Sequence, residues 1–244
     1  MLVIIIVLSG SISIIQAAGL QDSRDIKAIG TIVYSSFKMG MYVISWNFNE
    51  YDAATIAATF DMSQSWWVGN PPNSNDPTAK MNAVHALNPD YKFLLYRNCR
   101  CIYDYWTDEW NYAQSQGWLL KDSNGNYVTE SNWGYSQNYM VDITNPAYQQ
   151  WVAAKIKSWL DQYPVFDGVM ADNSLQDGEA GFSGASKTRP INPSTGTYFT
   201  DQQLLDGCAG ILNAIIDAIG TSKLLLPNGV WNGAIWWNTW PGGD

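Results

Sequence analysis

Basic residues are scarce in this sequence. Its 244 residues include 13 Lys and Arg against 22 Asp and Glu, which gives a formal net charge of −9 at pH 7. No cluster of Lys or Arg occurs along the chain, and a protein that binds nucleic acid needs such a cluster to neutralise phosphates. We therefore expect no nucleic-acid partner.

Recognisable metal and nucleotide motifs are also missing. The only histidine is His85, which with three cysteines cannot supply a zinc site at the usual spacings. Asp122, Asn124 and Asn126 alternate like calcium ligands, but the glycine comes two positions too early for a calcium loop and Trp133 stands at the twelfth position in place of Glu, so a hairpin turn is favoured. No glycine-rich phosphate loop is present. We expect no metal and no cofactor.

Charged side chains are absent from the N-terminal segment. Residues 2–15 are almost wholly apolar, and small residues follow at positions 17–19. The run contains serine and glycine and is shorter than the roughly 20 apolar residues of a transmembrane helix. We predict a signal peptide over residues 1–18, secretion, and no stable membrane insertion after cleavage. An uncleaved membrane anchor is the alternative.

The few cysteines leave their pairing open. Cys99 and Cys101 are two residues apart in a strand-like segment, so their side chains point to opposite faces and a bridge between them would be strained. Either can pair with Cys208 in a secreted protein, which leaves one thiol over.

Aromatic side chains are abundant instead. The chain has 13 Trp and 14 Tyr, while only 14% of its residues are charged. Indole faces stack on the apolar faces of sugar rings, so this composition suits a neutral carbohydrate ligand. The alternative for any single Trp is packing in the core.

Strand and helix patterns alternate after a linker over residues 19–37. Patterns typical of strands occur at residues 41–46, 60–68, 91–96, 166–171 and 223–226, with a further candidate at 139–143. Patterns typical of helices occur at residues 53–60 and 76–87, from Asn145-Pro146 to Pro164, and from a capping box at Thr200 to Gly220. Residues 97–137 read as irregular, with a hairpin at 121–128.

This alternation predicts an α/β fold with a parallel sheet. We predict a (β/α)8 TIM-barrel type, of which residues 38–244 form the N-terminal part. The barrel is expected to be truncated after about five or six βα units, because eight units take roughly 250 residues. An open sheet is the alternative.

Ligands of parallel α/β sheets bind at the carboxyl ends of the strands. Asp172 follows the apolar run at 166–171 and is the candidate catalytic carboxylate, with a capping role as the alternative. Amide, guanidinium and indole groups that follow expected strands can hold hydroxyl groups and sugar rings. These candidate substrate-binding residues are Trp46, Asn47, Trp67, Arg97, Asn98, Asn173, Asn228 and Trp231.

Four motifs carry a resemblance to a known family. Residues 166–173 (FDGVMADN) resemble the DGV-x-x-DN signature of secreted TIM-barrel glycoside hydrolases. This group includes the hypothetical glycosyl-hydrolase-like family 15 and is similar to α-galactosidase-type and endo-polygalactosaminidase barrels. Residues 118–125, 141–146 and 92–98 resemble further family motifs in the same order, and the match spans about residues 40–232.

The resemblance implies a glycosidase that uses two carboxyl groups on an oligosaccharide or polysaccharide. It assigns Asp172 as the nucleophile and places the acid/base on a later strand, beyond Asp244, so that the chain as given would be inactive. Within the chain the substitutes are Asp104, Asp142 and Glu179.

Asp142 reads more readily as a residue that orients the start of a helix, and Asp167 reads as structural because it precedes the buried part of its strand.

Two other functions stay open. A non-catalytic carbohydrate-binding barrel would keep the aromatic cleft without a competent carboxyl pair, and an anchored structural protein would retain residues 2–15. A second carboxyl group roughly 5–10 Å from Asp172 would favour hydrolysis. No feature of the sequence indicates whether the protein is a monomer or an oligomer.

Overall fold

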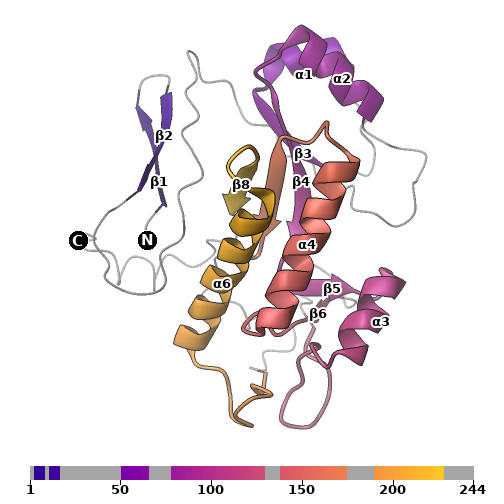
Figure 1. The fold of residues 1–244 in the computed structure, drawn as a ribbon, viewed down its shortest axis with the longest axis vertical. Helices are drawn as coiled ribbons and strands as arrows, with labels where there is room; N and C mark the ends of the chain where they lie inside the picture. The colour runs from indigo at the N-terminus through magenta and orange to yellow at the C-terminus, as the bar shows by residue number, and fades with distance from the viewer. Residues whose placement is uncertain are drawn as a thin grey trace. The chain divides into compact units, whose positions relative to one another are not determined.

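The computed structural model of the chain describes residues 3–8, 11–16, 51–65, 78–129, 138–174 and 190–227 (Figure 1). The helices are α1 (Ala53–Thr59), α2 (Thr78–Leu87), α3 (Thr107–Ser115), α4 (Pro146–Gln162) and α6 (Asp201–Ile219). The strands are β1 (Val3–Leu8), β2 (Ser11–Gln16), β3 (Met62–Ser65), β4 (Lys92–Asn98), β5 (Cys101–Tyr103), β6 (Asn138–Met140), β7 (Gly168–Asp172) and β8 (Leu224–Pro227).

The described residues fall into two compact units. The first holds β3, nearly all of β4 and β7, most of β8, helices α1 and α2, and the C-terminal parts of α4 and α6. The second holds residues 98–152 and 172–214, which include β5, β6, α3 and the N-terminal parts of α4 and α6.

A four-stranded sheet with the order β3-β4-β7-β8 forms the centre of the first unit. β3 and β4 are parallel. The N–H of Asp167 donates to the carbonyl oxygen of Phe93 (2.8 Å), and that of Cys99 donates to Asp172 (2.9 Å), so hydrogen-bond partners advance in the same direction along β4 and β7. The predicted parallel α/β sheet is confirmed, and the described strands do not close into a barrel.

The two faces of this sheet pack differently. On one face Leu94 and Tyr96 of β4 form a buried cluster with Met170 of β7, and Met62 and Leu224 pack against it. Because side chains alternate along a strand, the residues between them lie on the other face.

That other face packs against α4. Phe93 stacks on Phe166 with 4.6 Å between ring centroids. Further along β4, the guanidinium carbon of Arg97 lies 5.5 Å from the ring centroid of Trp159 of α4.

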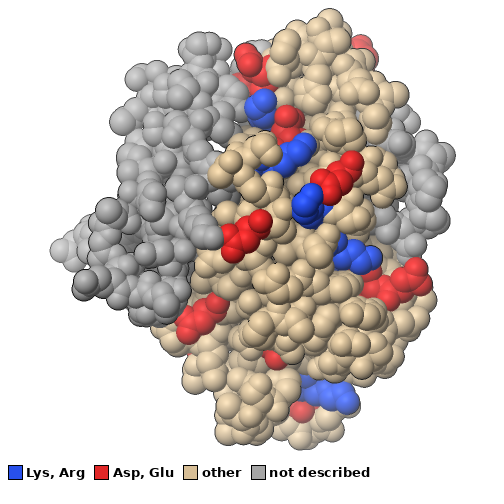
Figure 2. Space-filling view, viewed as in Figure 1, with Lys and Arg blue, Asp and Glu red and all other residues tan. Residues whose placement is uncertain are grey.

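Helix α4 begins where the sequence predicts. The Asn145 side chain accepts a hydrogen bond from the N–H of Ala147 (2.9 Å), which caps the first turn. The predicted apolar stripe is buried along its whole length and consists of Val152, Ile156, Trp159 and Leu160. The exposed side carries an ion pair between Lys157 and Asp161 (2.6 Å), and on the face shown in Figure 2 charges of both signs are interspersed.

Helix α6 runs beside α4 (Figure 1). The Gly210 backbone comes so close to the Gln149 side chain that a Cβ at this position would overlap it. The predicted capping box is present, because Gln203 N–H donates to Thr200 Oγ1 (3.2 Å) and Thr200 N–H donates to Gln203 Oε1 (2.9 Å). Gly220, at φ 70°, follows the last turn and donates to Ile216, as expected of a C-terminal glycine.

The stretch at residues 97–137, which reads as irregular, contains regular structure. β5 pairs with β6 in antiparallel fashion, with Ile102 opposite Tyr139. Helix α3 has no side-chain cap at Trp106 but carries Asp108 and Glu109 in its first turn. This acidic first turn is a helix-start signal within the stretch that was expected to be irregular. The predicted hairpin is confirmed by the antiparallel bridge between Lys121 and Tyr127.

The N-terminal apolar residues form an antiparallel hairpin of β1 and β2. Among the described helices, none is long and apolar enough to cross a membrane. The cysteines Cys99, Cys101 and Cys208 are buried and form no disulfide. The expected strand at 41–46 and the linker at 19–37 lie outside the described residues.

Candidate active site

The carboxyl ends of β4 and β7 meet in the second unit. The N–H of Cys99, directly after β4, donates to the carbonyl oxygen of Asp172, the last residue of β7 (2.9 Å). The Asp172 side chain is partly buried. A partly buried carboxyl group at the end of a parallel strand is positioned as ligand-binding groups of such sheets are.

Alternation along the strands shows which face carries Asp172. Met170, two residues earlier on β7, belongs to the cluster with Leu94 and Tyr96. Asp172 therefore shares the face of Met170, and Asn98 shares the face of Tyr96. The structure brings Asp172 and Asn98 to one edge and one face of the sheet.

Arg97 departs from this arrangement. Its side chain is fully buried, at 0% exposure, and it lies on the opposite face against Trp159. The sequence places Arg97 at a strand end correctly but does not reveal its face. The side chain packs between β4 and α4. The expectation that Arg97 holds substrate stays a prediction.

Asn98 shapes the backbone at the strand end. Its side-chain oxygen accepts hydrogen bonds from the N–H groups of Arg100 (3.0 Å) and Cys101 (2.9 Å), and the residue is 2% exposed. This arrangement turns the chain out of β4 and into β5. The observed contacts of Asn98 are therefore with backbone.

Asn173 turns the chain sharply after β7. Its φ of 57° makes it the single non-glycine residue in the described ranges with a left-handed backbone. Asparagine tolerates this conformation better than most residues. Non-glycine residues with a left-handed backbone persist only where the surrounding structure holds them in place. They are more frequent at functional sites than elsewhere.

An aromatic cluster follows β5 in the same unit. Tyr103 stacks on Tyr105 (ring centroids 5.0 Å apart) and meets Trp106 edge-on (4.5 Å). Tyr103 and Trp106 are buried, but Tyr105 is 42% exposed and offers ring surface to solvent. Tyr105 is not among the substrate-binding residues expected from the sequence, although it lies two positions after the segment 101–103.

The substitute carboxyl groups lie in different settings. Asp142 is 4% exposed, and its Oδ1 accepts from the N–H (3.0 Å) and hydroxyl (2.6 Å) of Thr144. This agrees with its interpretation as a residue that orients the start of α4. Asp104 is partly exposed in the turn after β5. Glu179 lies outside the described residues.

Asp167 lies at the opposite end of β7 from Asp172. Its Oδ2 accepts from the N–H of Phe93 (2.8 Å) and lies 3.4 Å from His85 Nε2, while Oδ1 lies 3.8 Å from Lys92 Nζ. These contacts tie β7 to β4 and α2, in agreement with the structural role expected of it.

Several expected substrate-binding residues lie outside the described parts of the chain. They are Trp46, Asn47, Trp67, Asn228 and Trp231. Within the described ranges no group of three or more His, Cys, Asp or Glu side chains is arranged to hold a metal ion.

Solved glycosidase structures resemble this chain. A Flavobacterium johnsoniae GH31 dextranase complexed with glucose has 14% identity and a TM-score of 0.47, over 72% of this chain and 23% of that one. A Thermus thermophilus α-galactosidase in complex with stachyose has 16% identity and a TM-score of 0.46, over 72% and 35%. A GH36 α-galactosidase variant from Geobacillus stearothermophilus, in complex with stachyose, has 11% identity and a TM-score of 0.50, over 78% and 28%.

The last of these supports a shared fold with a glycoside hydrolase. This chain spans about a quarter to a third of the length of these structures. A comparison with curated protein sequences finds no significant match.

A protein-family comparison matches residues 85–240. The matched region contains both strand ends of the site, the hairpin at 121–128 and the FDGVMADN segment. Since it covers more than half of the chain, the protein belongs to the hypothetical glycosyl hydrolase family 15.

Proposed function

We propose that this protein is a glycoside hydrolase that cleaves glycosidic bonds in an oligosaccharide or polysaccharide, with Asp172 as its nucleophile. One observation carries the proposal: in a chain of a glycosyl hydrolase family, a partly buried carboxyl group ends a parallel strand at the edge where such sheets bind ligands.

The chemistry asks for two carboxyl groups. Asp172 attacks the anomeric carbon, the bond from this carbon to the leaving oxygen breaks, and a carboxylic acid protonates that oxygen. Water then hydrolyses the glycosyl–enzyme ester and releases Asp172. The acid expected beyond Asp244 stays a prediction.

The surroundings of Asp172 support its role. The left-handed turn at Asn173 and the hydrogen bond from Cys99 to the Asp172 carbonyl hold the backbone of the nucleophile in place. A fixed backbone positions the carboxyl group for attack without an ordering cost during the reaction. We include Asn173 and the exposed ring of Tyr105 among the groups that contact the sugar.

We also propose that Trp46, Asn47, Trp67, Asn228 and Trp231 complete the sugar site. Their side chains have the stacking and hydrogen-bonding chemistry that a pyranose ring requires. Secretion is proposed from the apolar run at residues 2–15. Sequencing the N-terminus of protein exported by the native host tests it, and a mature chain that starts near Gly19 is expected.

Hydrolysis of a glycan panel by the full-length gene product tests the catalytic role. We expect Asp172→Asn to lower kcat by several orders of magnitude, because the amide is a far weaker nucleophile. Asp161→Asn is the matched control, since Asp161 is an exposed aspartate on α4 paired with Lys157. Turnover by the Asp172→Asn protein at the wild-type rate would remove Asp172 from the mechanism.

A second variant separates a nucleophile from a binding group. In Asp172→Ala, added azide can occupy the space of the missing carboxylate and attack the anomeric carbon. We expect azide to restore turnover of an activated aryl glycoside and to yield a glycosyl azide, detected by mass spectrometry. If wild-type protein binds glycans and hydrolyses none, the chain is a non-catalytic carbohydrate-binding barrel.

A further inference from the structure

Two turns that are distant in sequence join in one short ladder in the second unit. Lys121 is bridged to Tyr127 within the first hairpin, and Ile191 is bridged to Tyr198 within a second one. Lys121 and Ile191 are themselves bridged, with the N–H of Ile191 donating to the Lys121 carbonyl (2.8 Å). The order across the ladder is Tyr127, Lys121, Ile191, Tyr198.

Directly opposed residues of antiparallel pairs project their side chains to the same face. These four residues therefore form one surface, here named the hairpin face. The Lys121 ammonium lies 5.1 Å from the Tyr127 ring centroid, which agrees with this placement. Tyr198, at the other end, is 51% exposed. Three strand spacings separate the two tyrosines, about 14 Å, which is long enough for an oligosaccharide.

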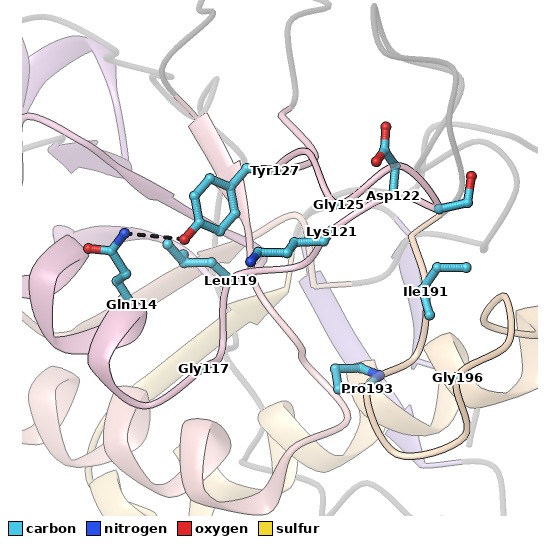
Figure 3. Close-up of a pocket in the computed structure, with 11 residues that line it drawn as sticks. Gln114, Gly117, Leu119, Lys121, Asp122, Gly125, Tyr127, Ile191, Pro193 and Gly196 are labelled. Atoms are coloured by element: carbon cyan, nitrogen blue, oxygen red, sulfur yellow. Dashed lines mark hydrogen bonds between the residues drawn. The ribbon is translucent and has the colours of Figure 1, made fainter.

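A hollow of about 620 Å³ opens between the two hairpins. Figure 3 shows Lys121 reaching from the first hairpin toward Tyr127, with Ile191 and Pro193 on the facing segment. Leu119 adds an apolar wall, and the Gln114 amide donates to the Tyr127 hydroxyl (3.2 Å). The hollow thus combines apolar walls with amide, ammonium and hydroxyl groups.

Both turns are held by internal hydrogen bonds. Asp122 Oδ1 accepts from the N–H groups of Asn124 and Asn126 (both 2.9 Å). These bonds, with that of Asn126 foremost, hold the pKa of the Asp122 carboxyl below its usual value. In the second turn, Asn192 Oδ1 accepts from the N–H of Ser194 (2.8 Å). A surface built on such turns loses little conformational entropy when a ligand binds.

The charge of the hollow favours a neutral ligand. Among the described residues that line it, Lys121 and Asp122 alone are charged, and their charges cancel. An anionic polymer would need a surplus of basic groups, and the described lining residues do not supply one. Flat apolar rings, hydrogen-bonding side chains and no net charge match the chemistry of a neutral glycan.

We propose that the hairpin face is a second, non-catalytic binding surface for a neutral glycan chain. This inference rests on the proposed function because it takes the ligand to be a carbohydrate. It assigns no step of hydrolysis to the residues of the hairpin face. Tyr198 supplies an exposed ring for stacking at one end, and Lys121 and Gln114 supply hydrogen-bond donors in the hollow. Binding here would keep a polysaccharide on the protein between cleavage events.

Affinity electrophoresis of the full-length protein through gels that contain dextran, galactomannan or polygalacturonate tests this surface. We expect at least one of the two neutral polysaccharides to retard the protein and the anionic one to have little effect. Tyr198→Ala is expected to weaken this retardation about tenfold, equivalent to about 1.4 kcal/mol. Tyr51→Ala is the matched control, because Tyr51 is similarly exposed (47%) in the other unit.

Tyr127→Leu keeps an apolar side chain and provides a second variant, and the melting temperature of each protein checks that it is folded. The inference is overturned if neither neutral polysaccharide binds, if polygalacturonate binds more tightly, or if folded Tyr198→Ala and Tyr127→Leu proteins bind as wild type does. Asp172→Asn separates the two proposals. If the Asp172→Asn protein no longer hydrolyses glycans but is still retarded in the gels, both proposals are supported. If wild type hydrolyses no glycan and Tyr198→Ala abolishes retardation, only the hairpin face is supported.

Discussion

At the scale of single residues, burial of a titratable side chain makes the stability of the protein depend on pH. Tyr91 follows α2 and is 0% exposed. Burial disfavours the charged phenolate and raises the pKa of Tyr91 from 10.0 to about 12. As the pH rises, the unfolded chain therefore loses the phenolic proton at a lower pH than the folded protein does. The stabilising effect is complete below about pH 10 and is lost as the pH rises toward 12.

Replacing Tyr91 by Phe should remove this dependence. We expect Tyr91→Phe to lose less free energy of unfolding than wild type between pH 8 and pH 11.5, by up to about 2 kcal/mol. Urea unfolding at both pH values, followed by circular dichroism, measures the difference. An equal loss in both proteins would show that Tyr91 ionises as freely in the folded state as in the unfolded one.

Gly168 illustrates a steric requirement at one residue. A Cβ at this position would overlap backbone atoms of Leu224 on the neighbouring strand, and backbone cannot move aside as a flexible side chain can. We expect Gly168→Ala to lower the free energy of unfolding by about 3 kcal/mol. Gly117→Ala is the control: Gly117 has open space but a φ of 70°, so only backbone strain of about 1 kcal/mol applies.

Urea unfolding of the two glycine variants gives the comparison. The steric account predicts the larger loss for Gly168→Ala. A loss at Gly168 no greater than that at Gly117 would contradict it.

At the scale of the elements, a capping box fixes the start of α6. The reciprocal bonds between Thr200 and Gln203 satisfy backbone N–H groups that the first helical turn leaves unpaired. We expect Thr200→Ala to lower the free energy of unfolding by about 1 kcal/mol and Thr200→Ser to retain most of it. Chemical denaturation measures both, and equal stability of the alanine and serine variants would argue against a capping contribution.

Local sequence signals locate several other elements. Asn145-Pro146 marks the first turn of α4, the apolar stripe from Val152 to Leu160 predicts its buried face, and Gly220 follows the end of α6. These features depend on residues within a few positions of one another. β5 and β6 are different, because each is short and finds its partner more than thirty positions away along the chain.

Net charge acts on the whole molecule. At −9, with basic groups dispersed along the chain, we expect the protein not to retard duplex DNA in a mobility-shift assay at physiological salt. The same protein should respond to a neutral polysaccharide in affinity gels. DNA retardation that weakens steeply with added salt would reveal a basic surface that the sequence does not suggest.

The amino-acid sequence by itself determines the parallel α/β class, the major helix termini, the 121–128 hairpin and the position of Asp172 at a strand end. Each follows from hydrophobic periodicity or from turn and cap chemistry over short distances. Tertiary structure alone decides which strands are neighbours and which face each strand residue occupies. That is why Arg97 lies against Trp159.

It also decides that Lys121 meets Ile191, since this contact joins backbones seventy positions apart. Such a contact depends on packing of the chain between the two segments, and no local pattern records it.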